Sequence, residues 1–386
     1  MPQVWKLKTG KDCAKQFKII KELVAKADEI VHAGDPDREG QLLVDEVLEQ
    51  VGNRKPVKRI LLNALDEKSV AEALHDLRDN KDFSGLKNSA LGRSRADWLV
   101  GMNLTRAYTD KARKAGYDSV LKVGRVKTPT MALIVRRETE IQNFKPVNYF
   151  TVQATFHSNL GNIPAAWQMP EDLTGLDSDG RLVDRAVADN LLKKFADLPK
   201  ETQGRISSVR ETKKQDGQRL PYSLSVLQIE AGRLYGYSPQ DVLKTMQALY
   251  EQKLTSYPRS DCDYLPENQL MEAEKILSHL GEIEGDIGVW AKNADASIRS
   301  RAWNDKKMSA HHAIIPTRIK ADLSALTDMQ KQLYFLVAKA YIAQFYPVHI
   351  YLATQIEIEF AGEKFVATGR TVTEPGWKSL YQDSKE

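Results

Sequence analysis

Residues 29–40, with the sequence EIVHAGDPDREG, decide how the first part of the chain is expected to fold. The run at 29–33 is typical of a short strand, and apolar residues at helical spacing over 17–27 precede it. A second strand-like run, KRILL at 58–62, is followed by a helix that opens near Asp66. Strand alternating with helix predicts an α/β unit with a parallel sheet.

Three carboxylates follow the first predicted strand directly. Asp35, Asp37 and Glu39 are spaced by two, so an extended turn would point them the same way. Ligands gather outside the carboxyl ends of strands in such sheets, and oxygen donors without His or Cys suit Mg²⁺. The alternative is an Asp-Pro turn before a helix N-terminus that favours acids. The motif alone leaves both interpretations open.

A tyrosine and an arginine stand close together in TSYPRSD, residues 255–261. If the segment is extended, Tyr257 and Arg259 leave on one face. Tyrosine can form a covalent intermediate, but its hydroxyl titrates near about 10 in model peptides, so attack at neutral pH needs help. A guanidinium beside a phosphate would stabilise negative charge and favour the phenolate. The alternative is a core tyrosine with a surface arginine.

Two histidines occur together in DKKMSAHHAIIPT, residues 305–317. His311 and His312 could transfer protons near pH 7 or, when protonated, contact phosphate. A zinc site is not expected, because no further Cys or His lies at ligand spacing. A structural role for either histidine is an equal alternative.

A basic block lies in the middle of the chain. Residues 93–137 carry eleven Lys or Arg and three Asp, a net charge of +8 in a chain whose total is +4. Such a block indicates a phosphate-binding surface or, equally, a solvated helix face. Inside it, Trp98 could stack on a base, although a tryptophan buried at a helix contact is commoner.

Further candidate contacts to a polyanion are the cations Arg106 and Arg113 and the segment 122–127, KVGRVK, where a glycine allows close backbone approach. Its residues are Lys122, Val123, Gly124, Arg125, Val126 and Lys127. Ser225 and Gln228 share one helix face at i and i+3, where they could hydrogen-bond a backbone. That last signal is weak on its own.

Composition sets limits on the class of protein. The chain has 386 residues, 42% of them hydrophobic and 28% charged, which is average for a soluble globular protein. No apolar run is long enough for a membrane helix, and no secretory h-region begins the chain. Cys13 and Cys262 cannot build a disulfide framework, so we expect a reduced cytoplasmic setting.

No GxxxxGK[ST] loop and no GxGxxG occurs, so no nucleotide cofactor is expected. Energy for phosphoryl chemistry would then come from elsewhere. A phosphotyrosine ester is one answer, because transesterification roughly conserves bond energy.

The pattern of the chain changes at Lys145-Pro146, after which alternation over 150–156 and again over 350–360 predicts strands. Ser238 with Pro239 predicts a helix start between these regions. We therefore expect a multidomain α/β, α and β protein with five segments: an α/β domain at 1–86, a basic helical segment at 87–146, a β region at 147–214, a helical domain with the tyrosine at 215–345, and a returning β segment at 346–386.

Six motifs, taken together and in order, resemble the DNA topoisomerase III branch of the type IA topoisomerases. They are AGDPDREG, RADWLVGMNLTRAYT, VGRVKTPT, PYSLSVLQIEA, KLTSYPRSDCDYLPE and DKKMSAHHAIIPT. The resemblance implies part of a torus-shaped fold with a partial Toprim domain. It also implies Mg²⁺-dependent, ATP-independent cleavage of single-stranded DNA, strand passage and resealing, by a protein expected to act as a monomer.

The resemblance also implies roles for individual residues. Tyr257 would form the 5′-phosphotyrosine and Arg259 would contact the scissile phosphate. Asp35 and Asp37 would hold Mg²⁺, with Glu39 as the third acid. The DNA path would be lined by Trp98, Arg106, Arg113, residues 122–127, Ser225, Gln228 and His311.

The chain departs from the family pattern in three places. It starts inside the family's Toprim region, after a strand that bears a glutamate and a lysine, and the family continues beyond residue 386. Lys127 stands where the family usually has glutamine. We therefore expect salt-dependent binding of single-stranded DNA with weak cleavage or inefficient resealing.

Two other functions compete with the topoisomerase interpretation. One is a catalytically impaired fragment that acts only as a single-stranded DNA binder. The other is a different Toprim enzyme, such as a primase or nuclease. Tyr257 with Arg259 argues against the latter, because those reactions need no covalent tyrosine.

Overall fold

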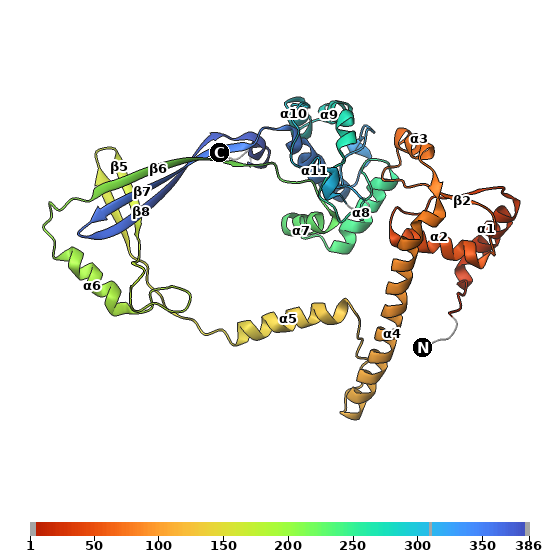
Figure 1. Cartoon of the computed structure of the whole chain (residues 1–386), viewed down its shortest axis with the longest axis horizontal. Helices are drawn as coiled ribbons and strands as arrows, with labels where there is room; N and C mark the ends of the chain where they lie inside the picture. Colours follow the sequence, from red (N-terminus) through yellow and green to blue (C-terminus); the bar gives the residue numbers. More distant parts are fainter. Residues whose placement is uncertain (1–4, 309–310, 383–386) are drawn as a thin grey trace. The chain divides into compact units, whose positions relative to one another are not determined.

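The structure, a computed structural model, describes residues 5–308 and 311–382. The chain forms two compact units (Figure 1). The first comprises residues 1–138 and 219–345, and the second comprises residues 139–218 and 346–386. The division into five segments is finer than these two units and stays a prediction. No helix among the described residues has the length and apolar character that crossing a membrane requires.

The α/β part of the first unit contains α1 (Ala14–Lys26), β1 (Ile30–His32), α2 (Arg38–Gln50), β2 (Val57–Arg59), α3 (Glu67–His75) and β3 (Arg78–Asp79). The sheet has the order β1-β2-β3, with β1 and β2 parallel and β3 antiparallel to β2. The predicted parallel pair is confirmed. The second strand is shorter than the expected run 58–62, because the chain leaves the sheet after Arg59.

The basic stretch is helical, as predicted. It contains α4 (Ser84–Lys114), which packs on α2, and α5 (Lys127–Gln142). The loop between them is held to α4 by side-chain hydroxyls, because the Val123 N–H donates to Thr105 Oγ1 at 3.0 Å and the Leu121 N–H donates to Thr109 Oγ1 at 3.1 Å.

The remainder of the first unit is helical and carries Tyr257. It contains α7 (Leu224–Tyr235), α8 (Pro239–Glu251), α9 (Ala273–Gly281), α10 (Asp286–Lys292) and α11 (Asp328–Ile342). Ser238 caps α8 as predicted, since its Oγ accepts the Asp241 N–H at 3.1 Å. The apolar faces of α8 and α11 are buried, including Val242, Met246 and Leu333.

The second unit is an antiparallel sheet with one helix against it (Figure 1). Its elements are β4 (Gln153–Ser158), β5 (Gly161–Trp167), α6 (Arg185–Ala196), β6 (Arg205–Asp216), β7 (His349–Phe360) and β8 (Glu363–Glu374), in the strand order β4-β5-β8-β7-β6. Residues on β6 and β7 pair from Arg205↔Glu359 to Asp216↔His349. The expected β region interrupted by a helical insert is confirmed, although β4 begins at Gln153 rather than near Phe150.

Candidate active site

The acidic loop lies between β1 and α2. Asp37 is the N-cap of α2, and its Oδ1 accepts the Gly40 N–H at 2.6 Å. The expected extended turn that points all three acids the same way is wrong, because the helix already begins at Arg38. Glu39 therefore lies in the first helical turn, where the unpaired N–H groups favour an acid.

A buried arginine holds the backbone of the acidic loop in place. Arg59 is 1% exposed, and its guanidinium donates to Gly34 O and Asp35 O, each at 2.7 Å. Its Nε also donates to Gln41 Oε1 at 2.8 Å. Burial lowers the pKa of Arg59 to about 10, so the group stays charged at neutral pH. The sequence analysis missed this residue, although a charge inside the apolar run KRILL was a signal for it.

Only glycine fits where α2 meets the loop. A Cβ on Gly40 would lie 2.5 Å from the backbone oxygen of Asp35 and 2.7 Å from its nitrogen. Because these are backbone atoms, a side chain could be accommodated only by moving the loop that carries Asp35 and Asp37.

Tyr257 meets this loop from the helical part of the same unit. Its hydroxyl donates to Asp37 Oδ2 at 2.9 Å, although the two residues are 220 positions apart in the sequence. Its backbone N–H donates to Asn63 O at 2.9 Å. The ring lies 5.6 Å from that of Tyr250 and 5.1 Å from that of His311, measured between centroids. The structure thus brings the tyrosine motif and the acidic loop together, as a shared role in one reaction requires.

The charge state of Tyr257 follows from this environment. Burial raises the pKa of its phenol well above the ordinary value, and the hydrogen bond to Asp37 and the Asp37 and Asp35 charges raise the pKa further. Arg259 lowers the pKa, but its effect is the smallest of these. Arg259 thus favours the phenolate, as expected, but burial and the two carboxylates oppose ionisation more strongly. Tyr257 is a protonated donor here.

Arg259 faces a cleft beside this hydrogen bond. Residues 258–259 form a turn, so the segment is not extended and the condition for a shared face of Tyr257 and Arg259 is not met. The cleft has a volume of about 910 Å³, and residues of α2 and α4 line it together with Asp37, Arg259 and His311. A strand of nucleic acid entering this cleft would meet both cations and carboxylates.

A chain of ion pairs runs along one side of the cleft. Glu39 contacts Arg93, and its Oε1 lies 3.1 Å from Arg38 Nε. Asp97 accepts from Arg125 Nε at 2.7 Å and lies 3.9 Å from Arg93. These side chains are partly exposed, and such pairs contribute little to stability. A phosphate can therefore compete for the arginines at small cost.

The two adjacent histidines have different surroundings. The His312 ring bonds Ala313 O through Nδ1 at 2.7 Å and Gln269 Nε2 through Nε2 at 3.2 Å, which indicates a structural role. His311 packs on Tyr257 and lines the cleft. Burial lowers the pKa of both, so both are neutral at pH 7. Ser309 and Ala310 of the same motif lie outside the described residues.

The predicted DNA-path residues are spread over several elements. Trp98, Arg106 and Arg113 lie on α4, where Trp98 is 44% exposed and makes an edge contact with Trp5 at 5.3 Å between centroids. Of these predicted residues, apart from His311, none is among the described residues that line the cleft.

The other predicted contacts are partly engaged within the protein. Lys122, Val123, Gly124, Arg125 and Val126 form the loop before α5, and Lys127 is the first residue of that helix. Ser225 is exposed on α7, whereas Gln228 on the same helix donates through Nε2 to Pro239 O at 2.8 Å. Gln228 would have to release this bond to reach a ligand.

The donor chemistry of the acidic loop suits Mg²⁺, which often binds through one or two carboxylates and keeps several waters. Asp35 and Asp37 provide hard oxygen ligands without competing sulfur. Within residues 5–308 and 311–382, however, no group of three or more His, Cys, Asp or Glu side chains is arranged to hold a metal ion. Glu39 is instead directed to arginines.

Two family profiles match the chain. The profile described as DNA topoisomerase matches residues 81–386, and the profile described as Toprim domain matches residues 4–65. The match to the first covers well over half of the chain. These matches confirm the resemblance that the six motifs indicated.

Individual relatives agree. The chain is 42% identical to DNA topoisomerase 3 of Vibrio cholerae, over 100% of this chain and 61% of the relative. It is 40% identical to DNA topoisomerase 3 of Haemophilus influenzae, over 98% of this chain and 60% of the relative. The chain thus spans about three fifths of the length of these relatives.

One solved structure, full-length topoisomerase I from Thermotoga maritima, matches with a TM-score of 0.73 at 20% sequence identity. The match covers 98% of this chain and 59% of that one. It shows a common fold and confirms the expected mixed helix and sheet architecture.

We expect Gly40→Ala to destabilise the first unit by about 1–3 kcal/mol, because the new Cβ displaces the Asp35 backbone. Urea unfolding followed by circular dichroism measures the change. Gly85→Ala is the matched control, since a Cβ at this α4 position meets no atom within 4 Å and should stabilise the helix by up to about 1 kcal/mol. Equal effects of both substitutions would contradict the close-approach argument.

Stability should fall in mild acid. Burial lowers the pKa of His32, His311 and His312 from the ordinary 6.5, so the unfolded chain takes up these protons first. The free energy of unfolding is then retained above pH 6.5 and lost below it, by up to about 1.4 kcal/mol per pH unit for each histidine. Urea titrations from pH 7.5 to 5 measure the slope. His312→Gln should lower the number of protons taken up on unfolding by about one, and so reduce the slope. An unchanged slope would refute the role given to His312.

Proposed function

Because the chain belongs to the DNA topoisomerase family, we propose that it is a type IA topoisomerase that cleaves single-stranded DNA through Tyr257, passes a strand and reseals the break. The observation that carries this proposal is the hydrogen bond from the Tyr257 hydroxyl to Asp37 Oδ2, at 2.9 Å. This bond joins the tyrosine that would form the phosphotyrosine to the acidic loop, which lies within the residues that the Toprim profile matches.

The proposed reaction is a balanced exchange of two phosphate esters. The Tyr257 oxygen attacks the phosphorus, the Tyr–O–P bond forms, and the bond from phosphorus to the 3′ oxygen breaks. The phenol proton passes along the hydrogen bond to Asp37, which releases it to water. The departing 3′ oxygen takes one proton from water and leaves as a hydroxyl. Resealing is the reverse reaction. Because one ester replaces another, no nucleotide hydrolysis is needed.

Deprotonation of the phenol is disfavoured in the docked arrangement. Burial and the neighbouring carboxylates hold the Tyr257 proton in place. A phosphate in the cleft would lie near Arg259, whose charge stabilises the negative charge that develops during transfer. We propose that DNA binding, by bringing the phosphate to Arg259, makes attack favourable only when substrate is present.

We propose that Asp35 and Asp37 hold Mg²⁺, with Glu39 as a third acid that first has to leave Arg93. A bound ion would supply positive charge that offsets the carboxylates and the phosphate. Asp37 already uses both oxygens, one for Gly40 N–H and one for Tyr257. Its position therefore links the start of α2, the cation site and the nucleophile.

DNA contacts away from the cleft are proposed from exposure and charge. Trp98, Arg106 and Arg113 on α4 would stack on or pair with the strand. Residues 122–127 would approach the backbone, and Ser225, Gln228 and His311 would complete the path. We propose single-stranded DNA as the partner, and a protein that acts as a monomer in the cytoplasm. The division of the chain into five segments is also part of this proposal.

The phosphotyrosine is tested with an oligonucleotide labelled at its 3′ end. After incubation with Mg²⁺ and denaturation, the label should migrate with the protein, because the 5′ phosphate of the downstream fragment is the one attached. Tyr257→Phe should abolish the adduct, while Tyr264→Phe, a half-buried tyrosine of the same segment, should retain it. Binding without any adduct in the unchanged protein would favour the non-catalytic binder instead.

Binding of single-stranded DNA should weaken with salt. Each phosphate neutralised by a Lys or Arg contributes about −0.7 to the slope of log K against log salt concentration. Arg106→Ala and Arg113→Ala should each reduce that slope, measured by fluorescence anisotropy. Arg185→Ala on α6, an exposed arginine paired with Asp189 in the second unit, should leave the slope unchanged. No affinity at low salt would refute the proposed DNA path.

A further inference from the structure

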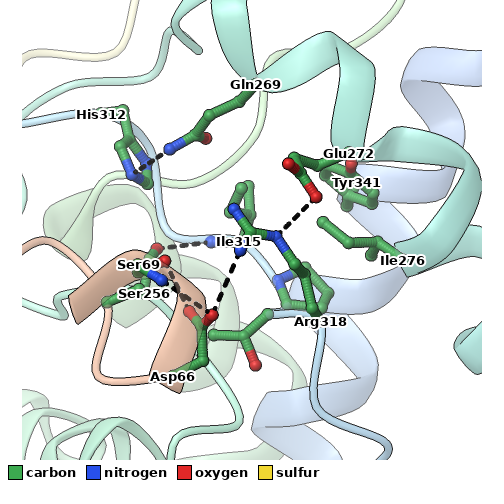
Figure 2. A pocket seen from close by; sticks show the side chains of 13 residues that line it. Asp66, Ser69, Ser256, Gln269, Glu272, Ile276, His312, Ile315, Arg318 and Tyr341 are labelled. Atoms are coloured by element: carbon green, nitrogen blue, oxygen red, sulfur yellow. Dashed lines mark hydrogen bonds and ion pairs between the residues drawn. The ribbon is translucent and has the colours of Figure 1, made fainter. Parts of the chain in front are cut away.

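A partly buried ion-pair network joins the start of α3 to the helical part that carries Tyr257 (Figure 2). Arg318 lies between two acids. Its Nη1 is 3.3 Å from Asp66 Oδ1 and its Nε is 2.6 Å from Glu272 Oε2. The three side chains are 11%, 5% and 16% exposed respectively, so water screens this network much less than the pairs along the cleft.

Lys68 adds a second connection between the same two parts. It lies on α3 and contacts Glu272, which belongs to the helical part. Its Nζ is also 3.6 Å from Glu72 on its own helix, and Glu72 lies 3.8 Å from Arg318. Two cations and three acids therefore meet across this contact.

Each side of the contact also compensates its own charge. Asp66 is the N-cap of α3, where it accepts the Ser69 N–H at 3.2 Å and the Ser69 hydroxyl at 2.6 Å. Arg318 keeps Glu272 as a partner from the same helical part. If the two parts separate, neither Asp66 nor Arg318 is left as an isolated buried charge. The Asp66–Arg318 pair therefore stabilises the docked contact, and breaking it does not leave an uncompensated buried charge.

The segments just before Asp66 and just before Arg318 both hydrogen-bond to Tyr257 or to its neighbours. Just before Asp66, Leu62 O accepts the Tyr250 hydroxyl at 3.2 Å and Asn63 O accepts the Tyr257 N–H at 2.9 Å. Just before Arg318, Ile315 O accepts the Ser256 N–H at 2.9 Å. The ion pair therefore closes the same contact that places Tyr257 on the acidic loop.

We propose that Arg318 is a positioning residue, whose pair with Asp66 keeps the Tyr257 segment docked on the acidic loop and whose release accompanies separation of the two parts. The inference rests on the proposed function, since strand passage requires a cut strand to open and close reversibly. Arg318 pairs with Asp66, Glu72 and Glu272, and it is not among the described residues that line the cleft. It acts only through the docking contact.

Two adjacent backbone amides can report this docking without any activity measurement. The Tyr257 N–H bonds Asn63 O across the contact, whereas the Ser256 N–H bonds Ile315 O within the helical part. Undocking exposes the first amide and leaves the second protected. Loss of local structure in the helical part would expose both.

The experiment compares hydrogen exchange at these two amides, by NMR on the full chain, in Asp66→Asn and Arg318→Gln. Asparagine retains the N-cap of α3, so Asp66→Asn removes the ion pair and spares the fold. We expect exchange at Tyr257 to quicken by about tenfold in either variant while Ser256 is unchanged. The yield of covalent adduct should fall at unchanged affinity for single-stranded DNA, and Arg318→Lys should recover part of it.

Lys320→Gln is the matched control, because Lys320 forms an exposed pair with Glu282 within the helical part. It should alter neither amide. Equal acceleration of both amides, or no change at either, in Asp66→Asn would overturn the positioning role. If the unchanged protein forms no adduct, the proposed function fails, while the two amides still decide whether Arg318 holds Tyr257 in place.

Discussion

The buried guanidinium of Arg59 is the constraint on which the candidate active site depends. It holds the carbonyls of Gly34 and Asp35, and so sets the path of the loop before α2 begins. That path places Asp37 at the helix start, with one oxygen on Gly40 N–H and the other free to meet Tyr257. A buried charge is costly unless it is fully hydrogen-bonded, so Arg59 and the loop stabilise one another.

The site combines a nucleophile held in a protonated state with cations held in weak pairs. Tyr257 is buried beside acids that oppose its ionisation. Arg93 and Arg125 are paired with carboxylates at the cleft, but these pairs are partly exposed and exchange partners easily. A phosphate that enters the cleft would therefore change the electrostatic balance of the site.

The contact between the Tyr257 segment and the α/β part has a different character. Its charges are mostly shielded from solvent and are compensated on both sides, by the α3 N-terminus for Asp66 and by Glu272 for Arg318. Backbone hydrogen bonds to Leu62 O and Asn63 O lie beside these charges. Such a contact favours a docked state without making separation prohibitive, which suits the strand passage that we propose.

The sequence by itself determined the main elements and which residues are candidates for the reaction, because caps, periodicity and short motifs are local features. Ser238 starts α8 and Asp66 starts α3, and apolar spacing marks the buried faces of α8 and α11. Only the tertiary structure decided which groups meet. The three acids do not share an extended turn, because Asp37 caps α2 and the helix begins at Arg38. The partners of Tyr257 and Arg318 lie 220 and 252 residues away in the sequence, and no local pattern encodes such packing.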